Sequence, residues 1–166
     1  MFLQKLDNNN GHSALNFVTV ILMLMVLTAG LLDLLNIVVV RSALNREAAI
    51  ITEHCMIQSG FRASVPSDWT QVYDNGDYWT SGTAKEYFVK GMKKTTVNPD
   101  TLKIQLGGRD IVPGADVIIA YQESSEIVAK CKYSYSYLKP FGLKEPVELK
   151  VTNPVTGFWI HKNNRV

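Results

Sequence analysis

An uncharged apolar run near the N-terminus constrains the fold of this chain more than any other feature. No Asp, Glu, Lys or Arg occurs from Ala14 to Leu32, and Asp33 is followed by a second apolar stretch, Leu34–Val40. The hydrocarbon core of a bilayer is about 30 Å thick, and about 20 helical residues cross it. The run is therefore long enough to span a membrane. Asp33 then lies near the far boundary, where a carboxylate costs much less than at the bilayer centre.

Two other interpretations of the run are less consistent with the sequence. A cleaved secretory signal has an apolar region of about 7–15 residues and a small-residue cleavage site. Here the run is longer, and Val38–Arg41 is a poor cleavage site. A buried core helix is the other alternative, but a small protein has little material to cover a helix that is apolar on all sides. We therefore expect one membrane-spanning helix.

The helix is predicted to continue beyond Asp33 with a different character. Apolar residues recur there at spacings of three or four, which places them on one stripe of a helix. These residues are Ile37, Val40, Leu44, Ala48, Ile51 and Cys55. No proline occurs before Pro66, and Gly60 is a suitable helix end. The pattern predicts one helix over residues 13–59, whose second half packs against a globular domain.

The remainder of the chain is predicted to be a small sheet domain. Residues 61–82 read as a loop and Ala84–Lys93 as a short helix, and period-two alternation or short apolar runs then indicate strands. The predicted strands are Leu102–Leu106, Val117–Tyr121, Glu126–Leu138, Val147–Val151 and Gly157–Ile160. Because no long helix separates them, the sheet is expected to be antiparallel. The fold class is therefore α+β, with a long N-terminal helix packed on a small antiparallel sheet.

The longest predicted strand carries an apolar face with a tyrosine stripe. Tyr133, Tyr135 and Tyr137 continue the face that begins at Ile127. A half-buried strand face explains this stripe better than a binding platform does.

The two cysteines, Cys55 and Cys131, allow two interpretations. Cys55 ends the apolar stripe of the helix, and Cys131 lies on the apolar face of the predicted strand Glu126–Leu138. If the sheet packs on the helix, the thiols can face each other and form one disulfide in an exported domain. Two independent buried thiols are the alternative.

Catalytic and metal-binding patterns are absent from the sequence. There is no GxSxG, HExxH, P-loop or GxGxxG motif, and no Cys/His cluster with metal-ligand spacing. His54 and Cys55 are neighbours, but adjacent helical residues point about 100° apart. Asp74–Asp77 matches only part of a calcium loop and is better explained as a turn. A net charge of +2 gives no footprint for nucleic acid. We predict a non-enzymatic protein without metal or cofactor.

The N-terminal pattern resembles the TadE-like pilin family, minor pilins of the tight-adherence apparatus within the type IV pilus-like systems. That family shows a Gly, a few small residues, Glu-Phe, a long apolar run, then Gly-x-x-Asp and an Ala-rich amphipathic stretch. Here Gly11–Phe17 matches the opening and Gly30–Asp33 the middle, while Ala43-Leu44 and Ala48-Ala49 match the end. The resemblance covers roughly residues 11–50.

The resemblance implies a domain organisation and a set of partners. A prepilin peptidase would cut between Gly11 and His12, so residues 1–11 would be a cytoplasmic leader. Residues 12–60 would form the pilin-like helix, with its membrane part at about 14–40, and residues 61–166 an exported domain, extracellular or periplasmic. Other pilin-like subunits, membrane lipid and an inner-membrane assembly platform would be the partners, in a filament or its priming complex. The basic residues Lys5, Arg41 and Arg46 slightly favour the opposite orientation, so the orientation depends on the resemblance.

The family pattern also implies residues that pack between subunits, and one of them departs from it. These residues are Asn16, Phe17, Gly30 and Asp33. The position of Asn16 is usually Glu, which is thought to pair with a neighbour's N-terminal amine. A neutral amide forms a bond about half as strong as a charge-assisted one. Asn16 therefore favours a minor or initiating subunit over a major one.

Two other function classes remain open at this point. One is a single-pass membrane protein whose exported domain binds a ligand or an envelope partner, unrelated to pili. The other is a membrane-tethered enzyme, for which the sequence marks no cleft with converging titratable groups.

Overall fold

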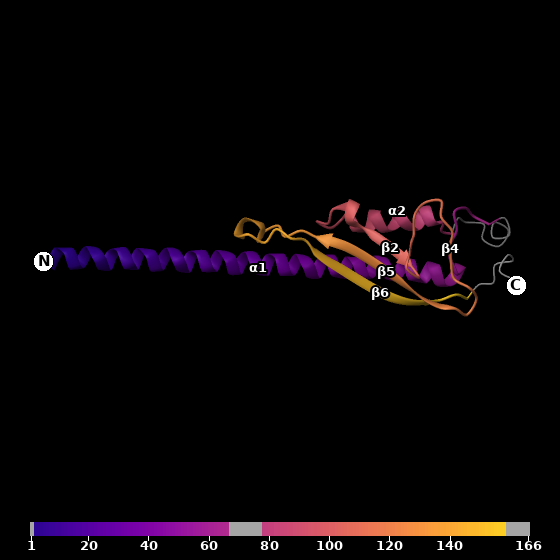
Figure 1. Ribbon diagram of the computed structural model, residues 1–166, viewed down its shortest axis with the longest axis horizontal. Coiled ribbons are helices and arrows are strands. Elements are labelled where there is room, and N and C mark those ends of the chain that lie inside the picture. The colour runs from indigo at the N-terminus through magenta and orange to yellow at the C-terminus, as the bar shows by residue number, and fades with distance from the viewer. Residues whose placement is uncertain (1, 67–77, 159–166) are drawn as a thin grey trace. The chain divides into compact units, whose positions relative to one another are not determined.

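The computed structural model describes residues 2–66 and 78–158, with only the backbone described for residues 2–12. The chain divides into two compact units. We call Met1–Ile37 with Tyr135–Glu145 the apolar unit, and Val38–Ser134 with Pro146–Val166 the sheet unit. The helix α1 (Phe2–Gln58) contributes to both (Figure 1).

The sheet unit is built on a four-stranded antiparallel sheet of order β3-β2-β5-β6. Its strands are β2 (Lys103–Leu106), β3 (Arg109–Asp110), β5 (Ser124–Tyr133) and β6 (Val147–Thr156). In the β5–β6 ladder, Ile127 lies opposite Asn153 and Cys131 opposite Leu149. Two short strands, β1 (Gly60–Phe61) and β4 (Val117–Ile118), form a separate antiparallel pair. Two single-turn helices, η1 (Pro99–Thr101) and η2 (Lys139–Phe141), complete the described elements.

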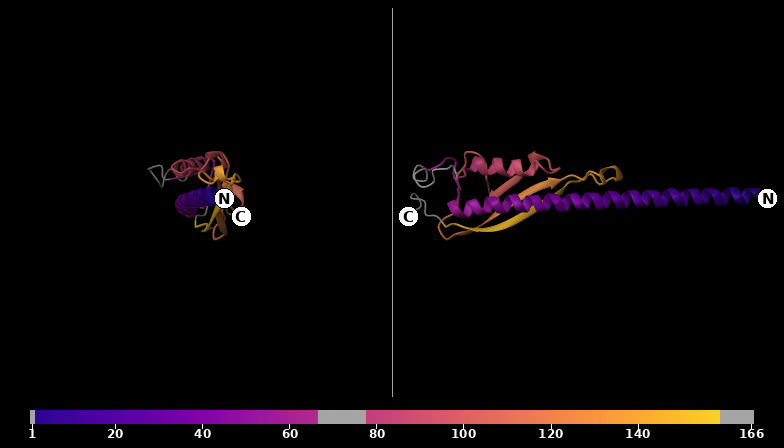
Figure 2. Two further views of the ribbon diagram at one scale, coloured as in Figure 1. Left: turned by 90° about the vertical axis from the view of Figure 1, so that its left-hand side faces the viewer. Right: turned by 180° about the vertical axis from the view of Figure 1, so that it is seen from behind.

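Helices cover one face of this sheet. Figure 2 shows α2 (Ser81–Met92) and the C-terminal half of α1 on the same side of the strands. The stripe on α1 is buried, with Leu44, Ala48, Ile51 and Cys55 all 0 % exposed. The sheet contributes buried side chains at alternate positions of β5 to the same core. The helix α2 contributes Ala84, Phe88 and Met92. This confirms the predicted α+β arrangement of a long helix packed on a small antiparallel sheet.

The boundaries of α1 differ from the prediction at its start. The helix begins at Phe2 rather than at residue 13, and it ends at Gln58, one residue before the predicted end. Ser59 (φ +53°) and Gly60 (φ +112°) turn the chain out of the helix. A Cβ at Gly60 would lie 2.7 Å from the Cα of Ile118, so only glycine allows β1 to pair this closely with β4.

The predicted strand Glu126–Leu138 is wrong at its C-terminal end. β5 stops at Tyr133, which is fully buried, whereas Tyr135 and Tyr137 belong to the apolar unit. The backbone N–H groups of Ser136–Leu138 bind a carboxylate instead of a neighbouring strand. The tyrosine stripe therefore does not exist as one face.

The remaining predicted elements are found in altered lengths. The helix α2 starts at Ser81, where the Thr80 side chain accepts the N–H of Thr83 as an N-cap. β6 continues to Thr156 through Pro154, which an edge strand tolerates. Gly157 forms a single bridge with Tyr121 rather than beginning a strand. The turn expected at residues 74–77, and residues 159–160, lie outside the described part of the chain.

A buried carboxylate lies where α1 meets α2. Glu47 is 3 % exposed and is paired with Arg46 at 2.6 Å. A Cβ added to Gly91 of α2 would lie only 2.5 Å from its Oε2 atom. Partial burial, and then the charge of Glu47, raise the pKa of Tyr87. Gly91 thus allows the two helices to approach around a charged group.

We expect Gly91→Ala to lower the free energy of unfolding by about 1–3 kcal/mol, because Glu47 must move within a packed site. Gly82→Ala is the matched control in the same helix. Its Cβ would meet its nearest neighbour at an ordinary 3.5 Å, so this change should be neutral or stabilising by up to about 1 kcal/mol. Chemical unfolding of the detergent-solubilised full chain measures both. Equal effects of the two substitutions would contradict the close approach at Gly91.

Candidate functional site

The apolar unit exposes an unusual amount of hydrophobic surface. Every large apolar side chain from Leu15 to Leu27 is at least 40 % exposed. These side chains surround α1 on all sides, so they do not form one face of a soluble core. Ser13–Gln58 is long and apolar enough to cross a membrane, with a mean hydropathy of 2.4 in its most apolar window. A soluble protein rarely leaves so large an apolar surface uncovered.

The structure separates the residues that were predicted to pack between subunits. Asn16 and Phe17 lie exposed on α1, and Phe17 is 67 % exposed. Gly30 faces open space, since a Cβ there would meet nothing within 4 Å. Asp33 lies about 25 Å along the helix from Asn16, at 1.5 Å per residue. Gly11 and His12 lie in the helical backbone, and their side chains are outside the described part.

Asp33 makes an intramolecular site that sequence reasoning missed. It is only 1 % exposed. Its Oδ1 accepts the N–H of Ser136 at 2.9 Å, and its Oδ2 accepts the N–H groups of Tyr137 and Leu138 at 3.0 and 2.7 Å. Successive backbone N–H groups in a turn form a concave site for an anion, and bonds to a charged acceptor are stronger than neutral ones. Asp33 therefore binds backbone donors of its own chain.

The signal for this site was present in the helical spacing. Asp33 continues the stripe of Ile37, Val40 and Leu44 by one turn toward the N-terminus, and Ala29, one turn earlier still, is only 8 % exposed. A carboxylate on a buried stripe needs hydrogen-bond donors, because an unpaired buried charge is very costly. The spacing thus indicates buried donors, although it cannot show that they come from residues 136–138.

The expected disulfide between Cys55 and Cys131 is not formed. Both cysteines are free and buried. The Asn153 Nδ2 atom lies 3.5 Å from the Thr52 Oγ1 atom, so Asn153 and its β5 partner Ile127 lie beside Thr52. From the level of Thr52, Cys131 lies in one direction along α1 and Cys55 lies in the other.

The register of β5 along α1 explains why Cys55 and Cys131 do not form a disulfide. Lys150, whose partner in the ladder is Lys130, lines a hollow with Val38 and Arg41 of α1. Cys131 is thus about 13 Å along β5 from the level of Thr52, while Cys55 is about 4.5 Å from it in the other direction. A disulfide needs Cα atoms about 4.4–6.8 Å apart. The sequence placed both cysteines on facing apolar surfaces, but it did not fix the register.

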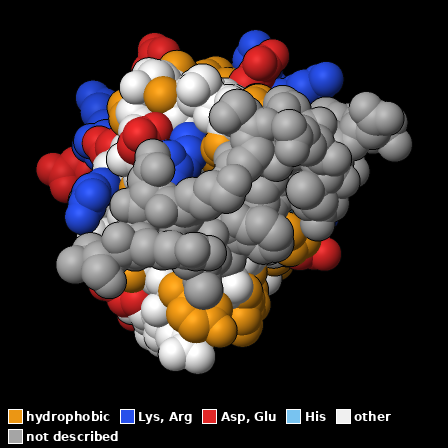
Figure 3. Space-filling view, turned by 90° about the vertical axis from the view of Figure 1, so that its right-hand side faces the viewer, with side chains coloured by type: hydrophobic (Ala, Val, Ile, Leu, Met, Phe, Trp, Pro, Cys, Tyr) orange, Lys and Arg blue, Asp and Glu red, His pale blue; other side chains and the backbone are white. Residues whose placement is uncertain are grey.

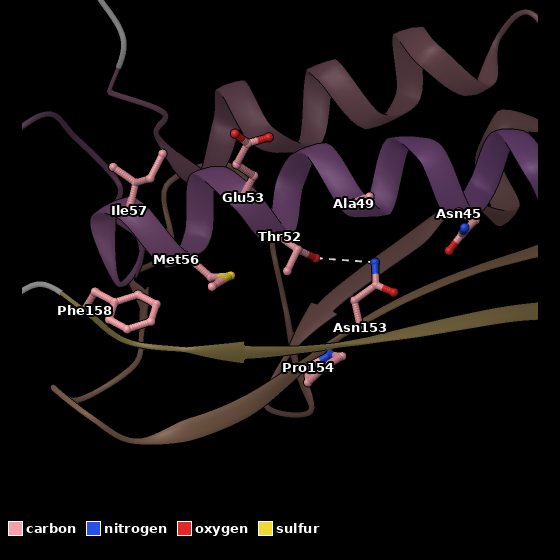
Figure 4. Close-up of a pocket in the computed structure, with 9 residues that line it drawn as sticks. All are labelled: Asn45, Ala49, Thr52, Glu53, Met56, Ile57, Asn153, Pro154 and Phe158. Atoms are coloured by element: carbon pink, nitrogen blue, oxygen red, sulfur yellow. Dashed lines mark hydrogen bonds between the residues drawn. The ribbon is translucent and has the colours of Figure 1, made fainter.

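A groove runs between α1 and the edge strand β6 in the sheet unit. Its volume is about 690 Å³. Figure 4 shows side chains of both elements along it, with the Asn153–Thr52 hydrogen bond crossing at one point. The residues that line it are Asn45, Ala49, Thr52, Glu53, Met56, Ile57, Asn153, Pro154 and Phe158. Such a lining suits an apolar or amphipathic segment and offers no acid–base pair.

The described residues contain no metal-binding cluster. No three His, Cys, Asp or Glu side chains gather there in a way that could hold a metal ion. The ring of His54 stacks on Trp79 with centroids 3.8 Å apart, so His54 serves packing rather than activation of the Cys55 thiol. Outside the atoms drawn in grey, Figure 3 shows Lys and Arg interspersed with Asp and Glu rather than gathered into one charged patch.

Comparison with protein-family models, curated protein sequences and solved structures found no match to this chain.

Removing the Asp33 carboxylate is expected to release Ser136–Leu138. For Asp33→Ala we expect the local opening free energy to fall by about 3 kcal/mol, since hydrogen bonds to a charged group contribute about 1.5–3 kcal/mol each. Amide exchange at Tyr137 and Leu138 should then be roughly 100-fold faster. Hydrogen exchange with mass or NMR detection measures this.

Asp116→Ala is the matched control for this substitution. Its exposed Oδ1 accepts the N–H of Ala63 at 2.7 Å, so its loss should affect only that neighbourhood. Unchanged exchange at residues 136–138 in Asp33→Ala would contradict the site.

The two thiols are expected to be unreactive in the folded protein. Burial raises the pKa of Cys55 from 9.0 to about 12. Burial, and then the charge of Glu148, raise the pKa of Cys131 to about 11. Only the thiolate is nucleophilic, so iodoacetamide at pH 8 should modify neither residue until the chain is denatured. Mass spectrometry without reductant should then show two alkylations. A disulfide-bonded species in exported protein would contradict the free thiols and support the Cys55–Cys131 disulfide.

The same pKa shifts predict a loss of stability at alkaline pH. Above pH 9 the unfolded thiols ionise while the folded ones stay neutral, so stability falls from pH 9 to about 12. For Cys55 the loss reaches up to about 4 kcal/mol. Chemical unfolding of the parent chain and of Cys55→Ala at pH 8 and 10.5 isolates this contribution, because the variant should lose less stability. Equal losses would contradict it.

Proposed function

We propose that this protein is a membrane-anchored, pilin-like structural subunit. The observation that carries the proposal is the change of environment along one continuous helix. From Leu15 to Leu27, α1 is apolar and exposed, whereas from Val40 to Cys55 its apolar stripe is buried against the sheet unit. The first part is suited to lipid or to like helices of other subunits. The second part belongs to a small polar-surfaced domain.

The proposal includes processing and location. A prepilin peptidase cuts between Gly11 and His12, the helix is retained in the membrane as a single span, and the sheet unit is exported. Other pilin-like subunits and an inner-membrane assembly platform are the partners. Because Asn16 cannot neutralise a neighbour's amine, the subunit is a minor or initiating one, which primes a type IV or Tad-like pilus or a related secretion or transfer apparatus.

The mature N-terminus tests this proposal. In the native host we expect the chain to be found in the membrane fraction, resistant to carbonate extraction, with its first residue at His12. Edman sequencing or N-terminal peptide mass spectrometry measures the start. Gly11→Asp should leave the chain in the membrane but unprocessed, because the substitution changes the cleavage site and not the apolar run.

A membrane-bound chain that keeps Met1 would contradict the pilin-like function. It would favour the second candidate, a single-pass membrane protein whose sheet unit binds an envelope partner. The groove between α1 and β6 is the observation that supports this candidate, since its apolar lining beside an edge strand suits a peptide segment.

A further inference from the structure

We propose that the segment Tyr135–Glu145, here called the interface loop, rests in the lipid headgroup layer of the membrane that α1 crosses. The loop connects β5 to β6 and belongs to the apolar unit. It would give the protein a second, shallow membrane contact beside its helical anchor. This inference rests on the membrane insertion of α1 in the proposed function.

The position of Asp33 sets the depth of the interface loop. The uncharged run Ala14–Leu32 is about 28 Å long as a helix, close to the thickness of a bilayer core. Asp33 follows directly and therefore marks the hydrocarbon boundary. Because it holds the N–H groups of Ser136–Leu138 at 2.7–3.0 Å, the loop is fixed at that same boundary. In Figure 1 the loop lies alongside α1.

The exposed side chains of the interface loop match that layer. Tyr137, Phe141 and Leu143 are 46 %, 42 % and 46 % exposed. Tyrosine is enriched at membrane–water interfaces, where its amphipathic ring lies at the level of the headgroups, and Phe141 and Leu143 add apolar surface beside Tyr137. In water these three side chains would remain uncovered, whereas in the headgroup layer their apolar surface is buried.

The charges of the interface loop favour anionic lipid. Two lysines of the loop, Lys139 and Lys144, are exposed, whereas only one exposed carboxylate, Glu145, lies in it. The Asp33 carboxylate already accepts backbone N–H groups. Lysines near an anionic lipid surface strengthen binding to it. Their long stems also allow the ammonium groups to reach phosphates while the chain lies flat.

The loop is shaped to hold these side chains in place. η2 forms a tight turn in which the N–H of Phe141 bonds to the carbonyl of Leu138 at 3.0 Å, and Gly142 closes it at φ +101°. The three bonds to Asp33 fix its other side. The exposed rings are therefore displayed by an ordered turn.

A second copy of the chain is a poorer occupant of this surface. The part of a neighbouring α1 at the depth of the loop, residues 33–46, carries two cations, Arg41 and Arg46, and one carboxylate, Asp33, whose oxygens already accept three backbone N–H groups. Lipid phosphates supply negative charge at the depth where the lysines lie.

Depth-dependent quenching tests the inference on the full chain in vesicles. Phe141→Cys carries an environment-sensitive fluorophore, and native Cys55 and Cys131 stay unlabelled because they are buried. We expect strong quenching by lipids spin-labelled near the headgroup and weaker quenching by lipids labelled at the chain end. Quenching should increase when phosphatidylglycerol is added to phosphatidylcholine, and this increase should be lost in Lys139→Gln/Lys144→Gln.

Two further labelled positions separate the possible failures. Leu24→Cys, on the apolar part of α1, should be quenched by the deep label, and Phe158→Cys, 61 % exposed in the sheet unit, by neither label. Quenching at residue 24 without quenching at residue 141 would overturn the interface loop and leave the anchor standing. No quenching at residue 24 would overturn both. The inference would also be overturned if residue 141 were protected from water and could be crosslinked to another copy, but were not quenched by either lipid label.

Discussion

A single helix has to satisfy two different environments along its length, and the rest of the structure depends on how it does so. From Ala14 to Leu32, α1 is apolar on every side, so this part is stable only where water is excluded. The second half is amphipathic, and one stripe supplies the helical side of the core. The sheet, α2 and the ladder β5–β6 are arranged around that stripe. The two parts meet at Asp33, the first charged residue after the uncharged run, and its carboxylate accepts backbone N–H groups.

Much of this fold could be predicted because periodicity reports burial directly. The spacing from Ile37 to Cys55 identified the stripe, and alternation identified β2, most of β5 and the first half of β6. These signals are local, since each residue's environment repeats with the geometry of its own element. The α+β class follows from them without any long-range information.

The features that could not be predicted are the ones set by register between distant segments. Tyr135 and Tyr137 continue the alternation of β5, but a competing acceptor on α1 takes the backbone donors of the next residues, so the strand ends. The cysteines are on facing surfaces but at different levels, which depends on how β5 lies along α1. Neither outcome has a local signature. The groove beside β6 was missed for the same reason, because its two walls are far apart in sequence.

The described residues combine a helix that is long and apolar enough to cross a membrane with a small sheet unit. The described residues contain no metal-binding cluster, and the histidine beside Cys55 is stacked on Trp79. The surfaces that the structure does show are an apolar stretch of helix, a turn bound to Asp33 and a groove beside β6. The buried Glu47 carboxylate, which pairs with the exposed Arg46, shows that a charged group also contributes to packing.

The proline in β6 has a consequence for how copies of this protein can associate. β6 is the last strand of its sheet, and strand edges of this length invite pairing with strands of other molecules. Pro154 has no N–H, so a continuous intermolecular ladder along this edge would be broken there, two residues before β6 ends at Thr156. The domain is thereby protected against growth by sheet extension and against the aggregation that often accompanies it. Ordered assembly then depends on contacts between side-chain surfaces, which can form and break without unfolding a strand.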